Sequence, residues 1–396
     1  MRQGSHSDGE VRQRDRWGRR ALAASGLLIL GACAGWAAFS LPLAAATPAI
    51  PATPEPAPLP TAQGALGAVH FPTSAGAAAQ AAFLRGVAAL HSFWYDEAAD
   101  AFREAAALEP GFALAYWGEA MTFNHPLWAE QDREAARTAL ARLGPDREAR
   151  AAKAPTAREK GYLEAVEVLY GEGGKAERDR AYAQAMGRLA TAFPDDDEAA
   201  AFRALSLLGT VQAGDPAESQ LRSRMQAAAI LEELFSHHPD HPGVVHYLIH
   251  SYDDPIHAPL GLRAARIYAR VAPAAPHALH MPAHIFVQLG RWQEAAASNE
   301  AAWAASVAWV ERRKLAAEKR DFHSLSWLHY AYLQEGRLQK AAETLELARH
   351  ATVEAPQSER IAGALAGMEA RQALETGGPA PAGAQTEGGG YARGGG

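Results

Sequence analysis

Apolar residues recur every three or four positions between residues 76 and 375, in segments separated by proline, glycine and aspartate. This spacing predicts a series of amphipathic helices. Alanine, leucine, glutamate and arginine dominate the segments, whereas runs of β-branched residues are scarce, so the fold is expected to be all-α. In the middle of the region and at its end, the spacing predicts helices over 156–170, 176–193, 198–211, 220–236 and 358–374.

Both ends of the chain depart from this pattern. Residues 1–20 carry six arginines, and residues 21–46 form an apolar run without charge, which predicts a signal peptide or membrane anchor. Residues 47–75 are rich in proline and alanine, which favours an extended linker. Residues 376–396 are rich in glycine and are expected to be disordered. The folded domain is therefore predicted to span 76–375.

Three forms of the N-terminal segment are open. An uncleaved anchor would keep the arginines on the cytoplasmic side. Alternatively, Cys33 follows Leu30-Gly-Ala, which resembles a bacterial lipoprotein box, and the alanines at 44–46 resemble an ordinary cleavage site. In each case we expect export to the periplasm or cell surface, with anchoring through residues 21–46 as the favoured form.

A repeat with a period of 34 residues runs through the helical region. Its positions 8, 20, 24, 27 and 32 are clearest in the unit that begins at Ala79, where they are Gly86, Ala98, Phe102, Ala105 and Pro110. Further units begin at Ala113, Pro242, Pro276 and Phe322. This pattern resembles the tetratricopeptide (TPR) repeat family. The resemblance implies five to seven helix pairs in a right-handed superhelical solenoid, whose first helices line a concave groove that binds proteins or peptides.

Two histidine pairs lie one repeat apart. They are His246-Tyr-Leu-Ile-His250 and His280-Met-Pro-Ala-His284, and histidines four positions apart share one helix face. In the TPR register both pairs occupy positions 5 and 9, which the family resemblance directs into the groove. Four imidazoles should therefore converge on one site, mononuclear or dinuclear, that suits copper, zinc or iron. Pro282, between two of these candidate ligands, is expected to kink its helix.

Further residues on the same expected face are weaker candidates. For the metal these are His91, His125, His257, His277, His323, Asp253 and Asp254. For the wall of the groove they are Trp117, Met121 and Asn124, which would face the histidines if the superhelix curls enough. Other histidines of the helical region and its borders are expected in surface turns (His70, His237, His238, His241) or as hydrogen-bonded core residues (His329, His350).

The net charge and the absence of certain motifs disfavour several classes of function. A net charge of -7 and a pI of about 6.2, with no basic stripe after residue 20, disfavour a nucleic-acid binder. A single cysteine excludes an intrachain disulfide and a cysteine-built metal site. No glutamate lies between the paired histidines, so the base of His-Glu-x-x-His proteases is missing.

Two classes of function fit these observations. One is an exported TPR protein that binds a transition metal in its groove, with a metalloenzyme of unknown reaction as one form. The other is a non-enzymatic scaffold that holds a protein or peptide partner. The blocks Tyr116–Met121, Asn124–Trp128 and His246–Pro255 look like those of exported bacterial TPR proteins, a resemblance that implies export and fold but no reaction and no catalytic residue.

Overall fold

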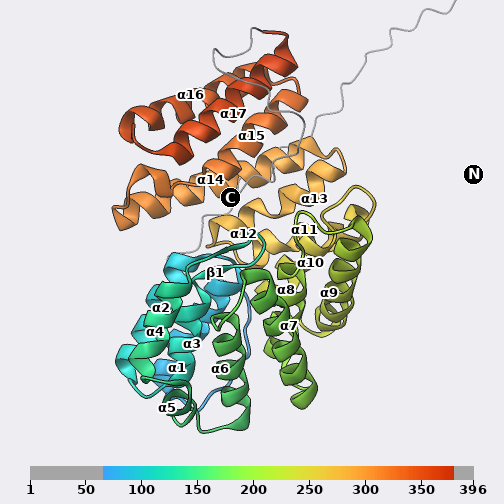
Figure 1. Cartoon of the computed structure of the whole chain (residues 1–396). Helices are drawn as coiled ribbons and strands as arrows, with labels where there is room; N and C mark the ends of the chain where they lie inside the picture. The colour runs from blue at the N-terminus through green and yellow to red at the C-terminus, as the bar shows by residue number, and fades with distance from the viewer. Residues whose placement is uncertain (1–65, 379–396) are drawn as a thin grey trace, which may run out of the picture. The chain divides into compact units, whose positions relative to one another are not determined.

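The computed structural model describes residues 66–378, and within this range the chain is built from paired helices (Figure 1). The exception is a small antiparallel ribbon that pairs β1 (Asn124–His125) with β2 (Glu130–Gln131). The expected all-α class and a TPR-like helical fold are confirmed for the described residues. In chain order the helices are α1 (Ala77–His91), α2 (Tyr95–Leu108), α3 (Ala113–Met121), α4 (Arg133–Leu143), α5 (Arg147–Ala151), α6 (Ala157–Leu169), α7 (Lys175–Ala192), α8 (Asp197–Gly209), α9 (Ala217–His237), α10 (Pro242–Ser251), α11 (Ala258–Val271), α12 (Pro276–His280), α13 (Pro282–Gln288), α14 (Trp292–Arg313), the 3₁₀ turn η1 (Ala317–Lys319), α15 (Phe322–Gln334), α16 (Leu338–Glu354) and α17 (Glu359–Thr376).

Helices adjacent in the chain pack against each other. The pairs are α1 with α2, α3 with α4, α6 with α7, α8 with α9, α10 with α11, α12 and α13 with α14, and α15 with α16. Helix α17 packs on both α15 and α16, where a closing helix was expected. The right-handed superhelical sense stays a prediction.

Small residues at repeat positions allow this close packing. A Cβ atom at Gly86 would lie 2.6 Å from the ring of Phe102, and one at Gly118 would lie 2.3 Å from it. Phe102, which is fully buried, therefore fills the space that the two glycines leave between α1, α2 and α3. This is the physical reason for the repeat pattern in the first unit.

The packed chain begins before residue 76, the predicted start of the folded domain. Phe71 is 1% exposed and its ring lies 5.1 Å from that of Phe83 and 5.8 Å from that of Trp117. The backbone N–H of Ala68 also donates to the carbonyl of Asp240. Residues 66–75 therefore belong to the packed structure, because an aromatic side chain in the proline-rich stretch is buried by the helices.

The other predictions for the chain ends lie mostly outside the described residues. This holds for the signal or anchor at 1–46, for Cys33, for the linker up to residue 65 and for the tail after residue 378. Between residues 66 and 378, no helix combines the length and the apolar character needed to cross a membrane.

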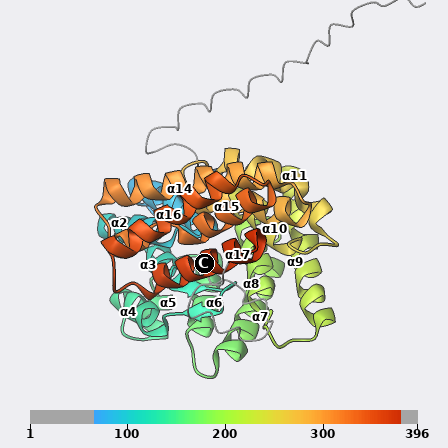
Figure 2. The same ribbon diagram turned by 90° about the horizontal axis from the view of Figure 1, so that it is seen from above.

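The N-terminal helix pair contacts helices far along the chain. The Nδ1 atom of His91, at the end of α1, lies 2.9 Å from the hydroxyl of Tyr247 on α10. The indole N–H of Trp309 on α14 donates to Glu97 on α2, and Arg313 pairs with the same carboxylate. Figure 1 shows α14 above α2, and Figure 2 shows both helices at the same side of the molecule. The contact between His91 and Tyr247 brings the first helix pair against α10, which carries one of the two histidine pairs.

Candidate metal centre

Six histidines from four helices gather in two sets of three. The first set is His246 and His250 of α10 with His277 of α12, and the second is His280 of α12, His284 of α13 and His323 of α15. Within each set, one ring nitrogen of every member lies within 4.8 Å of the others. The structure thus joins the four histidines of the paired motifs with His277 and His323, two of the weaker candidates.

A helix break separates the members of the second pair. Helix α12 ends at His280 and α13 begins at Pro282, because proline lacks the N–H that would continue the helix and suits a first helical turn. The Nε2 atoms of His280 and His284 nevertheless lie 3.0 Å apart. The break therefore leaves the two rings facing each other.

In the first set, the Nε2 atoms of two rings lie against the bare Nε2 atom of His246. The Nδ1 atom of His246 lies 2.6 Å from the backbone carbonyl of His91, which can only accept, so Nδ1 carries the proton. In the neutral ring, Nε2 is then a bare acceptor. It lies 3.1 Å from Nε2 of His250 and 3.1 Å from Nε2 of His277. One lone pair cannot accept well from both rings, whereas a central cation would satisfy all three nitrogens.

In the second set, two ring nitrogens that both carry lone pairs face each other directly. Nδ1 of His280 lies 2.6 Å from Oδ1 of Asn299, whose amide group donates to the carbonyl of Ala295 and is thereby oriented. Nδ1 of His284 lies 2.7 Å from the carboxylate of Asp253. Both Nδ1 atoms must donate, so in the neutral rings the two facing Nε2 atoms both carry lone pairs. A positive charge, either a proton or a metal ion, has to lie between them.

The pKa values of five of the six histidines are lowered, which disfavours protonation of those five rings. Burial lowers the pKa of His246 to about 3, despite the opposing hydrogen bond to the carbonyl of His91. Burial first and neighbouring histidines second lower the pKa values of His250, His277 and His280 well below 6.5. Burial also lowers the pKa of His323, which Asp321 only partly offsets. These rings are therefore neutral near pH 7, the state in which imidazole binds metals.

The contacts behind the rings match those of metal ligands. Histidines that bind metals usually donate their second ring N–H to a carbonyl or carboxylate, which fixes the tautomer. Here the carbonyl of His91, the amide of Asn299 and the carboxylate of Asp253 take this role. Asp253 is itself held by the amide of Gln288 at 3.2 Å. Sequence reasoning had Asp253 as a weaker candidate and did not identify Asn299, which lies 19 residues after His280 on another helix.

Aromatic rings lie against both sets, with Phe93 at the first and Trp327 at the second. The ring of Phe93 lies 4.4 Å from that of His246 and 5.5 Å from that of His277. The indole of Trp327 lies 4.5 Å from the ring of His284 and 5.4 Å from that of His280. Phe93 adopts a left-handed backbone conformation, with φ of 52°, in the short turn between α1 and α2. No sequence motif marks either aromatic, since both depend on how distant helices meet.

His91 belongs to a different buried cluster. Its Nε2 atom lies 2.7 Å from one carboxylate oxygen of Glu198, and Nε2 of His241 lies 3.0 Å from the other. The backbone N–H of Val244 donates to Nδ1 of His241, so Nε2 of that ring carries the proton and has no lone pair for a metal. Although these three side chains are close enough to hold an ion, we assign them to a hydrogen-bonded network. His241, expected in a surface turn, is 3% exposed, because it caps the start of α10 and pairs with Glu198.

Three of the weaker metal candidates lie outside both sets. The imidazole of His125 stacks on Tyr95 with ring centroids 4.1 Å apart, and its Nδ1 atom lies 3.5 Å from Glu130. His257 pairs with Asp254 at 2.8 Å, in the loop before α11. These contacts are local, so the structure does not bring these side chains to the six histidines.

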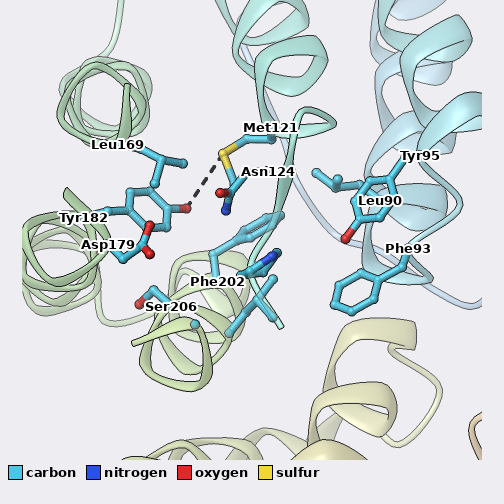
Figure 3. Close-up of a pocket in the computed structure, with 13 residues that line it drawn as sticks. Leu90, Phe93, Tyr95, Met121, Asn124, Leu169, Asp179, Tyr182, Phe202 and Ser206 are labelled. Carbon is cyan, nitrogen blue, oxygen red and sulfur yellow. Dashed lines mark hydrogen bonds between the residues drawn. The ribbon is translucent and has the colours of Figure 1, made fainter. Parts of the chain in front are cut away.

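The three residues expected in the groove wall do not lie together in the structure. Trp117 is fully buried in the core, where its ring lies 5.3 Å from those of Tyr162 and Phe202. Met121 and Asn124 line a mainly apolar pocket (Figure 3). The figure shows these two side chains between the rings of Tyr182 and Phe202, with Leu90, Phe93 and Tyr95 at the other side. Phe93 contacts the first set as well, so this pocket adjoins the candidate centre.

Comparisons with known proteins give little beyond this geometry. No family model matches the chain, and no curated protein matches it. Eighteen chains of solved structures do match. One is the crystal structure of the TPR domain of P58(IPK), with 13% identity, coverage of 75% of this chain and 80% of that one, and a TM-score of 0.19. A likeness at this TM-score carries no argument, so the TPR-like description depends on the helix pairs and on their packing.

Proposed function

We propose that the protein binds a transition metal through its six clustered histidines. The observation that carries this proposal is the meeting of unprotonated Nε2 atoms, above all those of His280 and His284 at 3.0 Å. Ligand nitrogens bound to one tetrahedral metal at about 2.05 Å are separated by about 3.3 Å. Three of the nitrogen pairs are spaced at 3.0–3.1 Å, close to that value, and all members of each set lie within 4.8 Å of one another. Neutral imidazoles in this number suit copper, zinc or iron.

The exposure of the ligands supports a reactive centre as one form of this function. His246 and His280 are fully buried, whereas the other members of both sets are partly exposed. A metal held by buried ligands on one side and reached by solvent on the other can activate a bound water or take up a small molecule. The metalloenzyme therefore remains part of the proposal, with its reaction unassigned.

The proposal also includes where the protein lies in the cell and how its helices are arranged. The arginine-rich start and the apolar run at residues 21–46 support export, with the folded domain held at the outer side of a membrane. The TPR-like fold supports a right-handed superhelical array. Such arrays serve widely as protein-interaction modules, so the second candidate is a scaffold that holds a protein or peptide partner, with the histidines as hydrogen-bonding contacts.

Elemental analysis separates the two candidates. Tag-free protein, stripped with a chelator and then dialysed against copper, zinc or iron, is expected to retain metal at close to whole-number stoichiometry. The double variant His280→Ala/His284→Ala should bind less metal than the wild-type protein while its helical circular dichroism persists, because these two ligands of the second set are removed. The variant His350→Ala is the matched control, because His350 is exposed on α16. Less than about a tenth of an equivalent of every metal in the wild-type protein would overturn the proposal.

A further inference from the structure

The two histidine sets are copies of one site, generated by the repeat. Each set consists of positions 5 and 9 of one unit and position 2 of the next. In the first set these are His246, His250 and His277, from the units that begin at Pro242 and Pro276. In the second set they are His280, His284 and His323, from the units that begin at Pro276 and Phe322.

The same rule explains why the copies stop at two. Position 2 of the unit at Pro242 is Gly243, where even a Cβ atom would lie 2.3 Å from Nδ1 of His91. Positions 5 and 9 of the unit at Phe322 are Ser326 and Tyr330. The units before and after therefore lack the ligands for a third copy.

The geometry of the copies agrees closely. In the first set, the centroid of His246 lies 4.8 and 4.9 Å from those of its two partners, which are 6.4 Å apart. In the second set, the centroid of His280 lies 4.9 and 4.7 Å from those of its partners, which are 6.3 Å apart. Each copy has its own buried central histidine, its own acceptor behind that ring and its own aromatic cover. Each set is therefore a complete three-nitrogen site.

The two sets adjoin each other. The ring of His250 lies 6.1 Å from that of His284, and the ring of His277 lies 6.0 Å from that of His280. These distances between the sets are no longer than the widest distance inside either set. Ions in neighbouring sites of this kind come within reach of one shared ligand, as in two-metal centres with a separation of about 3.5–4 Å.

The chemistry of the ligand atoms decides which metal ions suit two adjacent sites. All six ligands are imidazoles, and the nearest carboxylate, that of Asp253, is bonded to Nδ1 of His284 on the side away from the other rings. Paired iron or manganese sites of helical proteins use bridging and terminal carboxylates, and magnesium and calcium require oxygen ligands. Among the remaining divalent ions, nitrogen donors bind copper most tightly.

We infer that the six histidines form a dinuclear copper centre, with one ion in each set and a single water or hydroxide as a bridge. This inference depends on the proposed metal binding and adds the number of ions, their identity and the roles of His277 and His323 as direct ligands. The partly exposed rings of the two sets would let solvent reach the ions. The bridging position is the place where a small exogenous ligand would enter.

Copper titration of the metal-free, full-length protein tests the inference. We expect two equivalents of bound Cu(II) by elemental analysis after dialysis. Two bridged Cu(II) ions couple their unpaired electrons, so the electron paramagnetic resonance signal should be much weaker than that of two separate ions. Competition with equimolar zinc should leave copper in both sites.

Substitution of one ligand in each set gives the second measurement. His250→Ala and His323→Ala are each expected to reduce the bound copper to one equivalent and to restore the signal of an isolated Cu(II) ion. His350→Ala should behave as wild type. One equivalent in the wild-type protein, lost in either variant, would show a single shared ion and overturn the dinuclear centre while leaving metal binding intact.

Two other results are also decisive. Retention of zinc in preference to copper would overturn the assignment of the metal. Binding of no metal at all would overturn both the inference and the proposed function. The wild-type stoichiometry does not depend on how well the variants fold, so the number of ions remains testable in every case.

Discussion

Replacement of Glu198 by glutamine tests the buried network behind the metal centre. The carboxylate is fully buried on α8 and lies 2.7 Å from Nε2 of His91 and 3.0 Å from Nε2 of His241. Burial alone would raise the pKa of Glu198, but His241 and His91 outweigh it and hold that pKa well below its ordinary value. The side chain is therefore a charged acceptor for two donors.

Glutamine keeps the shape but offers one acceptor in place of two. One of the histidine N–H groups would then face an amide NH₂, and the negative charge that supports both rings would be gone. Removal of one partner from a buried, charged and hydrogen-bonded group costs about 3–5 kcal/mol. We expect Glu198→Gln to lower the free energy of unfolding by this amount in urea denaturation.

The neighbouring residue provides the control. Asp197 pairs with His238 at 2.9 Å, but both side chains are partly open to solvent, at 32% and 45%. An exposed pair contributes about 0–1 kcal/mol, so Asp197→Asn should change the free energy of unfolding little. If the two variants lose equal stability, or if Glu198→Gln loses less than about 1 kcal/mol, the network does not hold α1, α8 and α10 together as described.

Three further predictions follow from particular contacts. Asp253→Ala should weaken copper binding about 10–100-fold with both ions still bound, since only the orientation of a ligand is lost; unchanged affinity in a competition titration would contradict this. Gly86→Ala should destabilise the protein by about 1–3 kcal/mol in urea because its Cβ meets an aromatic ring. Gly363→Ala, in open space on α17, should be neutral or stabilising by up to about 1 kcal/mol, and equal effects of the two alanines would refute the packing argument. Chelator-treated protein should lose stability as the pH falls below 6.5, because the lowered pKa of His246, about 3, lets only the unfolded chain take up the proton. This residue alone contributes a loss of about 1 kcal/mol between pH 7 and 5.5, and an unchanged urea midpoint would contradict it.

The sequence predicted the local structure well because helical periodicity is a local property. Helices expected over 156–170 and 176–193 are observed at Ala157–Leu169 and Lys175–Ala192. The 34-residue spacing also placed the two histidine pairs on matching faces, and Pro282 marks a helix break as expected. The burial of Phe71, before the predicted start of the folded domain, could not be read from spacing, because it depends on helices that lie further along the sequence.

Tertiary packing decided how the histidines are used. The sequence could not tell that His277 and His323 complete the two sets, while His91, His125 and His257 bond elsewhere. That division depends on where each helix lies against the next unit, which periodicity within one helix does not specify.

By itself, then, the sequence determined an all-helical repeat and four imidazoles on one face, because both follow from spacing along a helix. The tertiary structure decided the tautomers and the partners of those rings. The carbonyl of His91 reaches His246 across 155 residues, and Asn299 reaches His280 from a different helix. Only folding brings such groups within hydrogen-bonding distance, and their acceptors are what leave the facing nitrogens bare for a cation.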